Sequence, residues 1–365
     1  MKLICDGLAL ADATLKVIKA IATKTTNPSL EGIKLVAEND KLKLCATDLE
    51  LMIEKTIKAD VKIEGTIVVP GKFFSEYVRK LSFEQISLEK IENQLKISYT
   101  DSEGFIQLLN VGEFPEFKKI DRQNYFELSK EDLKDAITKT IFSASIDDAR
   151  PILKGCLFEI ANELTVVALD GYRLALGRKK ISKKTGEVSF VVPVKSLSEI
   201  TKLLDEGKET IKVFFERQFI MIEHDDTIIM SRLLDGEFIN YKQIITSNFT
   251  SRVTVNKKQL EDALDRTALL ARAERNNLAK FEVKDKILSI TSNSEIGNIH
   301  ENVTIALSGS DITTAFNARY FIECLKVVND DFIVMNFTSH IAPCVITPNQ
   351  GEDFLFLILP VRIIN

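Results

Sequence analysis

One short pattern occurs three times in this chain of 365 residues. The pattern Leu-x-Asp-Ala-x-x-Lys/Arg begins at Leu10, Leu133 and Leu260, so the copies lie 123 and 127 residues apart. A period this long is the size of a domain, because solenoid repeats are about 20–50 residues long. A repeat of this size is also large enough to bury a core of its own. The chain is therefore predicted to fold as a tandem array of three similar domains.

A second repeated segment carries pairs of basic residues seven positions apart. Seven residues span two helical turns, so both cations of a pair lie on one face of a helix and the apolar residues lie on the other. Pro70 and Pro193 precede two of these segments and suit a strand-to-helix junction. The pairs are Lys72 and Arg79, Lys195 and Lys202, and Arg319 and Lys326.

The repeated cations form the main clue to a ligand. An ordinary solvated lysine face would account for any one of these helices. Six predicted helices with a cation at the same position are better explained by a repeated surface for a long polyanion. In the first helix of each repeat, the corresponding cations are Lys16, Lys139 and Arg266.

Alternating segments between the helices predict strands. Period-2 patterning occurs at residues 41–47, 94–99, 163–168, 212–215 and 286–291. We therefore predict an α+β fold in which each domain packs two amphipathic helices on antiparallel sheets. Similar segments that begin at Gly112 and Gly236 precede polar linkers. These linkers predict domains of residues 1–122, 123–247 and 248–365.

Composition and motifs exclude several classes of protein. A hydrophobic content of 45% and a charged content of 28% are typical of a soluble globular chain. The start of the chain does not read as a signal peptide, and no segment is long enough to span a membrane, so we expect a cytoplasmic protein. Five scattered cysteines fit reduced thiols. The three isolated histidines and the absence of metal, phosphate-loop or nucleophile motifs predict no catalysis, no cofactor and no metal.

Several segments, taken in order along the chain, resemble the bacterial sliding clamp family, the beta subunit of DNA polymerase III. These segments are residues 46–50, 68–73, 112–115, 168–174, 191–193 and 359–362. The resemblance implies a DNA-clamp domain in three copies and a homodimer that closes head to tail into a ring around double-stranded DNA. It also implies a processivity factor that tethers the replicative DNA polymerase and other proteins with a clamp-binding motif. A separate ATP-driven clamp loader would open the ring.

Physical arguments agree with such a ring. Three repeats with similar ends make a heterologous interface, which must close or polymerise. Contacts to phosphates carry no base sequence, so a ring held by them can slide. Retention by topology requires little affinity, which reconciles DNA binding with a net charge of −5.

The resemblance assigns roles to individual residues. The DNA-facing set adds Lys24 and Arg150 to the repeated cations, and Lys24 stands where the family often has Arg. The dimer seam is expected at Phe105, Ile106, Leu108, Leu269, Leu270, Glu295 and Glu301. Partner peptides are expected in an apolar cleft formed by Leu153, Leu169, Gly171, Tyr172, Arg173, Leu174, Ile244, Leu359, Pro360, Val361 and Arg362. Ile239 and Gln243 depart from the family pattern near this cleft, which leaves the preferred peptide open.

Two other interpretations remain open from the sequence. The chain could be a three-domain α+β enzyme whose basic helices bind a nucleotide or a phosphorylated substrate. Such an enzyme would need a cluster of polar residues in one pocket and would give no reason for equivalent cations in all three repeats. The chain could also be a protein scaffold whose cations only keep it soluble. Charge reversal at the repeated positions separates these interpretations, because only a DNA-binding protein would lose DNA retention.

Overall fold

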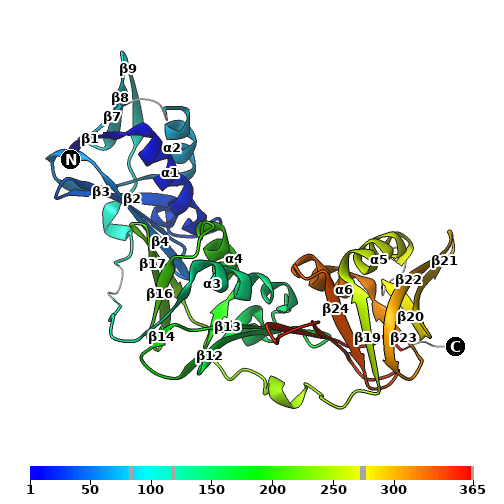
Figure 1. Ribbon diagram of the computed structural model, residues 1–365. Coiled ribbons are helices and arrows are strands. Elements are labelled where there is room, and N and C mark those ends of the chain that lie inside the picture. The colour runs from blue at the N-terminus through cyan, green and yellow to red at the C-terminus, as the bar shows by residue number, and fades with distance from the viewer. Residues whose placement is uncertain (82–84, 117–119, 272–276, 363–365) are drawn as a thin grey trace. The chain divides into compact units, whose positions relative to one another are not determined.

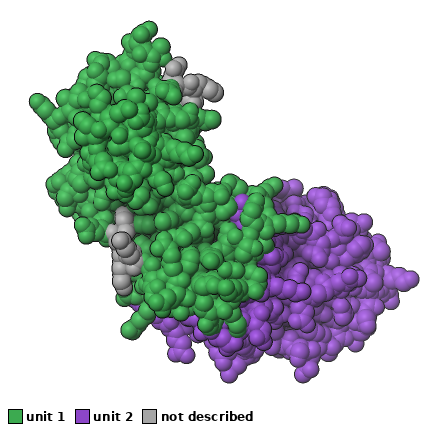
Figure 2. Space-filling model, turned by 60° about the vertical axis from the view of Figure 1, so that its left-hand side comes forward, with its two compact units in different colours: residues 1–129, 182–186, 198–233 green, residues 130–181, 187–197, 234–365 purple. Residues whose placement is uncertain are grey.

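The computed structural model describes the chain except for residues 82–84, 117–119, 272–276 and 363–365 (Figure 1). The chain forms two compact units, which Figure 2 distinguishes by colour. Unit 1 contains residues 1–129, 182–186 and 198–233, and unit 2 contains residues 130–181, 187–197 and 234–365. No helix among the described residues is long and apolar enough to span a bilayer.

Six α-helices lie in the described residues, two in each third of the chain, as the two repeated patterns predicted. Helices α1 and α2 lie side by side in unit 1, and α5 and α6 lie side by side in unit 2 (Figure 1). The helices are α1 (Gly7–Val17), α2 (Gly71–Val78), α3 (Lys130–Thr138), α4 (Val194–Leu203), α5 (Lys257–Ala271) and α6 (Ala318–Lys326).

The helix starts follow from local sequence. Asp6 caps α1, because its carboxylate accepts a hydrogen bond from the backbone N–H of Ala9 at 2.7 Å. Asn317 caps α6 in the same way. Pro70 and Pro193 are the last residues of the strands that lead into α2 and α4. The prolines therefore mark the strand-to-helix junctions, one position before the first helical turn where they were expected.

Unit 1 contains two antiparallel sheets. The five-stranded sheet has the order β5-β1-β7-β8-β9, and the nine-stranded sheet has the order β14-β10-β16-β17-β18-β4-β3-β2-β6. The strands are β1 (Lys2–Asp6), β2 (Gly32–Glu38), β3 (Lys41–Thr47), β4 (Leu51–Lys58), β5 (Asp60–Ile63), β6 (Gly65–Pro70), β7 (Gln85–Ile91), β8 (Gln94–Tyr99), β9 (Ser102–Gln107), β10 (Tyr125–Ser129), β14 (Lys183–Lys184), β16 (Thr210–Phe215), β17 (Phe219–His224) and β18 (Thr227–Arg232).

Unit 2 contains one continuous sheet of twelve strands with the order β15-β11-β12-β13-β26-β25-β24-β19-β22-β21-β20-β23. The strands are β11 (Gly155–Ile160), β12 (Glu163–Leu169), β13 (Arg173–Lys180), β15 (Val188–Pro193), β19 (Ser251–Asn256), β20 (Leu278–Lys284), β21 (Ile287–Ser294), β22 (Gly297–Gly309), β23 (Ile312–Asn317), β24 (Phe332–Phe337), β25 (Cys344–Pro348) and β26 (Phe354–Ile358). Phe281 on β20 contacts Phe316 on β23 and Phe321 on α6, with ring centroids 5.4 and 4.9 Å apart.

Successive repeats are joined by pairing between strands. In unit 1, β4 of the first repeat pairs with β18 of the second, with Met52 opposite Met230. In unit 2, β13 of the second repeat pairs with β26 of the third, with Leu174 opposite Leu357. The sheets therefore run across the predicted domain boundaries. Part of the second repeat belongs to the unit of the first repeat and part to the unit of the third, so three repeats form two compact units. The boundaries themselves stay a prediction.

One backbone hydrogen bond recurs in all three repeats. A residue that closely follows the last strand of each repeat donates its N–H to a carbonyl on the strand before the second helix. The bonds run from Leu109 to Val68 at 2.8 Å, from Leu234 to Val191 at 2.9 Å and from Val361 to Ala315 at 2.8 Å. The threefold repeat in the sequence is thus a threefold repeat in backbone structure.

Two glycines make this closure possible in the first two repeats. A Cβ atom on Gly32 would lie 2.5 Å from Val68 Cγ1 and 2.9 Å from Leu109 Cδ1. A Cβ atom on Gly155 would lie 2.6 Å from Val191 Cγ1 and 2.8 Å from the corresponding Leu234 Cδ1. Only glycine therefore lets the closing leucine pack against the strand.

We predict that Gly32→Ala and Gly155→Ala each lower the free energy of unfolding by about 1–3 kcal/mol, because the added methyl group overpacks a closed contact. Gly186→Ala is the matched control, because its Cβ atom would meet nothing within 4 Å. That control should change stability by less than about 0.5 kcal/mol. Urea denaturation measures all three, and equal effects would contradict the closure described here.

Candidate functional site

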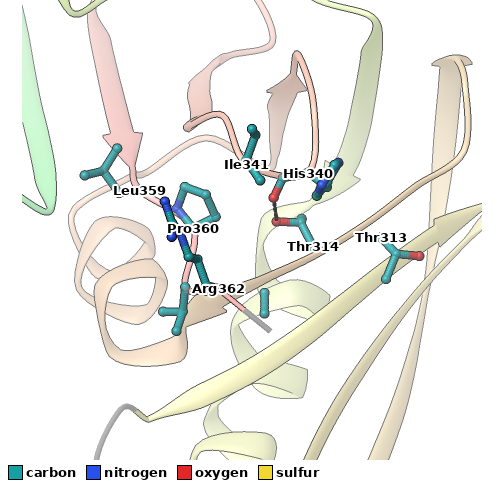
Figure 3. Close-up of a pocket in the computed structure, with 9 residues that line it drawn as sticks. Thr313, Thr314, His340, Ile341, Leu359, Pro360 and Arg362 are labelled. Carbon is teal, nitrogen blue, oxygen red and sulfur yellow. Dashed lines mark hydrogen bonds between the residues drawn. The ribbon is translucent and has the colours of Figure 1, made fainter. Parts of the chain in front are cut away.

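The C-terminal segment of the chain lines a groove in unit 2. The groove has a volume of about 640 Å³ and is lined by Thr313, Thr314, Ala315, His340, Ile341, Leu359, Pro360, Val361 and Arg362 (Figure 3). The segment is held at both ends, because Leu359 N–H donates to Tyr172 O at 2.9 Å and Val361 N–H donates to Ala315 O at 2.8 Å. Thr314 Oγ1 donates to His340 O at 3.1 Å and ties the opposite side to β23. Residues 359–361 are therefore an ordered wall of the groove.

A tight turn before β13 positions three more of the predicted cleft residues. Asp170 accepts hydrogen bonds from the backbone N–H groups of Tyr172 and Arg173 at 2.9 and 3.0 Å. Gly171 has φ of +92°, a conformation that suits glycine. The turn leaves Tyr172 63% exposed next to Leu359.

Arg173 lies at the centre of a buried ionic cluster. Its guanidinium group donates to Asp170 at 3.0 Å, to Phe142 O at 2.6 Å and to Glu323, and it stacks 4.5 Å from the ring centroid of Tyr320. Burial raises the pKa of Glu323, but hydrogen bonds from Arg173 and Arg319 outweigh it and hold that pKa below its usual value. Arg173 is thus a structural cation that fixes the turn, and little of it is accessible to a peptide.

The three leucines predicted for the cleft lie beneath the surface of unit 2. Leu153, Leu169 and Leu174 are buried and belong to one apolar cluster with Tyr241 and Leu357. They form a packed layer that includes residues of β12, β13 and β26, and their role in the cleft stays a prediction. Ile244 and Leu359 are exposed, and Pro360 and Val361 are half-buried, so these four offer apolar surface.

Sequence reasoning missed one side of the groove. Thr313, Thr314 and Ala315 on β23, and His340 and Ile341 in the loop before β25, line it without having been predicted. Ile341 is a large apolar side chain left exposed. The alignment of Ala315 with Val68 and Val191 was available from the repeats and could have identified this wall.

The cations on the second helix of each repeat are exposed. Lys72, Arg79, Lys195, Lys202, Arg319 and Lys326 all reach solvent. Lys202 pairs with Glu199 at 2.7 Å and Arg319 with Glu323 at 2.6 Å. Surface ion pairs of this kind contribute little stability and exchange readily for another anion. Lys24 and Arg150 are also exposed, on loops.

The cations on the first helix of each repeat are engaged within the protein. Lys16 pairs with Asp12 at 3.1 Å, four residues earlier in the same motif. Lys139 pairs with Asp135 at 2.7 Å, is only 7% exposed and lies over the ring of Phe354. We expected Lys139 to face DNA, and its burial corrects that expectation. In the third copy, Arg266 hydrogen bonds to Glu301 at 2.7 and 2.8 Å and holds the pKa of Glu301 below its usual value.

The predicted seam residues lie on and just after strand β9 in unit 1, and at the end of α5 and around β22 in unit 2. Strand β9 pairs only with β8 among the described residues, and its Phe105 is 49% exposed. Ile106 and Leu108 are buried in unit 1, so we correct them to core residues. In unit 2, Leu269 is 65% exposed at the end of α5, and Leu270 is half-buried. Glu295 is exposed, and Glu301 is committed to Arg266.

The described residues contain little that suggests catalysis. They include no group of three or more His, Cys, Asp or Glu side chains that could hold a metal ion. Burial raises the pKa of the Cys5 and Cys156 thiols to about 12, which keeps them protonated and poor nucleophiles near neutral pH.

Comparisons with known proteins cover the full length of the chain. Residues 1–118, 127–240 and 242–362 match the N-terminal, central and C-terminal domains of the DNA polymerase III beta subunit. The beta sliding clamp of Bacillus subtilis is 32% identical over 376 residues, which cover 99% of this chain and 100% of the relative. The beta sliding clamp of Staphylococcus epidermidis is 30% identical and covers 94% of this chain and 95% of its own.

Solved structures agree with these matches. The crystal structure of the DNA polymerase sliding clamp from Bacillus subtilis has a TM-score of 0.97 at 30% identity, and 100% of each chain is covered. A putative DNA polymerase III beta subunit from Eubacterium rectale has a TM-score of 0.96 at 32% identity, with the same coverage. The three tandem α+β domains predicted from the repeats are confirmed, and the chain belongs to the family of bacterial DNA polymerase III beta subunits, the beta sliding clamps.

Proposed function

We propose that two copies of this chain close into a ring around duplex DNA and tether the replicative DNA polymerase as a processivity factor. The single observation that supports a ring most directly is the strand pairing between repeats. Strand β4 pairs with β18, and β13 pairs with β26, so each repeat joins the next through the same pair of strands. The family is non-catalytic, so the proposed role is mechanical.

Each junction pairs one strand type from one repeat with a second strand type from the next repeat. Among the described residues, one strand of each type has no partner from another repeat. By the repeat alignment, β9 corresponds to β18 and β26, and the first half of β22 corresponds to β4 and β13. Strand β9 has one neighbour among the described residues. Residues 297–304 of β22 pair with β21, whereas β19 pairs with β22 only from Ile305 onward. An open edge templates pairing with another chain, so β9 of one copy and β22 of the other would complete the series.

Exposed side chains near these edges fit a seam. Phe105 lies on β9, and Leu269 and Leu270 lie at the end of α5. Ile296, which sequence reasoning missed, is a further exposed apolar residue in the turn before β22. A head-to-tail contact of this kind forms a closed ring only if two copies complete the rotation, and a filament otherwise.

The basic helices would supply the DNA-facing surface. Each repeat presents two exposed cations on its second helix. These cations would contact DNA phosphates and not the bases, so the ring would bind any sequence and slide along it. Arg266 is exposed and paired with a carboxylate, as Lys202 and Arg319 are, so it stays in the proposed set; the Lys16 side chain is only 24% exposed and would contribute less, and Lys139 is left out.

The C-terminal groove would receive partner proteins. Its exposed apolar side chains include Leu359 and Ile341, and its charged side chain is Arg362. A short segment with a Leu or Phe side chain would fill such a groove, and ordering that segment would offset part of the binding free energy. The polymerase, the clamp loader and other proteins with a clamp-binding motif are the proposed partners.

Charge reversal tests the DNA-facing surface. We predict that Lys72→Glu, Lys195→Glu and Arg319→Glu, combined, weaken binding to a short linear duplex. The log–log salt slope should become shallower by roughly 0.9 for each phosphate that the variant no longer neutralises. A control variant, Lys41→Glu with Lys208→Glu and Lys284→Glu, changes three exposed lysines outside the helices by the same charge. Fluorescence anisotropy across a salt series measures both, and an equal weakening in the two variants would reject a helix-specific surface.

Substitution of the groove tests partner binding. We predict that Ile341→Ser with Leu359→Ser weakens binding of a fluorescent Leu-Phe peptide by about tenfold or more, since each large apolar side chain contributes roughly 1.5–3 kcal/mol when buried. Phe332→Ser, which alters an exposed apolar residue of the same repeat, should leave affinity unchanged. Removing residues 359–365, of which 363–365 lie outside the described residues, should abolish peptide binding and leave the oligomer intact. Undiminished binding to either groove variant would refute the groove.

A further inference from the structure

Unit 1 contains a second groove, which lies at the junction of the first and second repeats. It has a volume of about 330 Å³. It lies where β4 pairs with β18, and the corresponding strand pair at the next junction is β13 with β26. Its lining includes Leu49, Glu50, Pro115, Glu116, Phe219 and Met230.

The turn that lines this groove has a counterpart at the next junction between repeats. Asp48 accepts hydrogen bonds from the backbone N–H groups two and three residues later, at 3.1 and 2.8 Å. Asp170 does the same at 2.9 and 3.0 Å. In unit 1, Arg232 N–H donates to Glu50 O at 2.8 Å, and in unit 2 Leu359 N–H donates to Tyr172 O at 2.9 Å. Glu50 therefore occupies the position of Tyr172 in the predicted cleft.

One residue of this turn is under backbone strain. Leu49 has φ of +77°, whereas Gly171 has φ of +92° at the same position of the other turn. The left-handed region is unfavourable for a leucine and unrestricted for glycine. The Leu49 side chain is also 58% exposed, so burial within the chain does not compensate for the strain. A strained and exposed leucine at a groove is a candidate contact for a ligand.

The groove has a distinct chemistry. Leu49, Pro115, Phe219 and Met230 supply apolar surface from separate segments of unit 1. The charged residues among those that line it are Glu50 and Glu116, both exposed carboxylates. The C-terminal groove has the opposite character, because its charged lining residue is Arg362. The two grooves would therefore select segments of opposite charge.

We propose that the unit 1 groove is a second docking site, for a short segment of a partner protein in which large apolar side chains are flanked by lysine or arginine. The apolar side chains would pack against Leu49 and Phe219, and the cations would face Glu50 and Glu116. A ring of two copies would then offer docking sites of two specificities, so partners with different motifs could bind without displacing one another.

Methionine methyl groups report on this site in the full chain. The five methionines are at positions 1, 52, 221, 230 and 335, and Met52 and Met230 line the groove. The probe is a synthetic peptide, Lys-Lys-Leu-Phe-Leu-Lys-Lys with blocked ends, titrated into protein labelled with carbon-13 at the methionine methyl groups. We expect the signals of Met52 and Met230 to shift in a saturable manner while that of Met335, buried in unit 2, stays unchanged.

Two variants separate docking from general charge attraction. Leu49→Gly gives the turn the residue found at position 171, so it should remain folded with an unchanged or higher melting temperature. It should weaken binding of the peptide by about tenfold, the effect of losing one buried leucine. Glu50→Lys with Glu116→Lys should reverse the preference toward a peptide with glutamates in place of lysines.

Several outcomes would overturn the proposal. One is the absence of any shift at Met52 and Met230. Another is equal binding of a control peptide that keeps the lysines and replaces the apolar residues by serine. A third is an undiminished affinity of Leu49→Gly. Shifts that grow with protein concentration before peptide is added would identify a second copy of the chain as the occupant instead.

Discussion

The backbone pairing of one repeat with the next is the interaction on which the rest of this structure depends. Strand β4 is completed by β18 and β13 by β26, so the sheets of successive repeats are continuous. Residues that close each repeat, such as Leu234 and Val361, follow closely after the strands that make these contacts. The groove at the end of the chain exists because Leu359 continues β26 along Tyr172. Pairing, closure and groove are thus consequences of one arrangement used repeatedly.

The same arrangement links charged residues to the groove. Glu323 accepts hydrogen bonds from Arg319, which is exposed on α6, and from Arg173, which is buried beside Tyr172. If an anion bound Arg319 and broke its hydrogen bond to Glu323, Glu323 would keep only the hydrogen bond from Arg173. The turn that holds Tyr172 is fixed by the same Arg173. The basic face of α6 and the turn that carries Tyr172 therefore share one carboxylate.

The repeats, the six helices and the alternating strands could be predicted from the sequence, because periodic patterns can be read from one sequence alone. It was not sufficient for side-chain direction where alternation is short. Ile106 and Leu108 face the core, although the adjacent Phe105 is exposed, because a shift of one residue reverses the face of a strand. Lys139 was misassigned for a different reason. Its partner Asp135 lies four residues earlier in the same motif. A cation that serves an ion pair within the protein therefore occupies the same repeated position as one expected to bind DNA.

Retention on DNA by topology is the property that most clearly distinguishes a ring from a protein that binds by affinity. The direct measurement is the residence of protein loaded on a nicked circular DNA, followed at moderate salt before and after the circle is cut once. A ring predicts long residence on the circle and rapid loss after linearisation, whereas Leu269→Ala with Leu270→Ala, at the proposed seam, should not be retained on either form. Residence that is unchanged by linearisation would contradict the ring and would indicate binding by affinity.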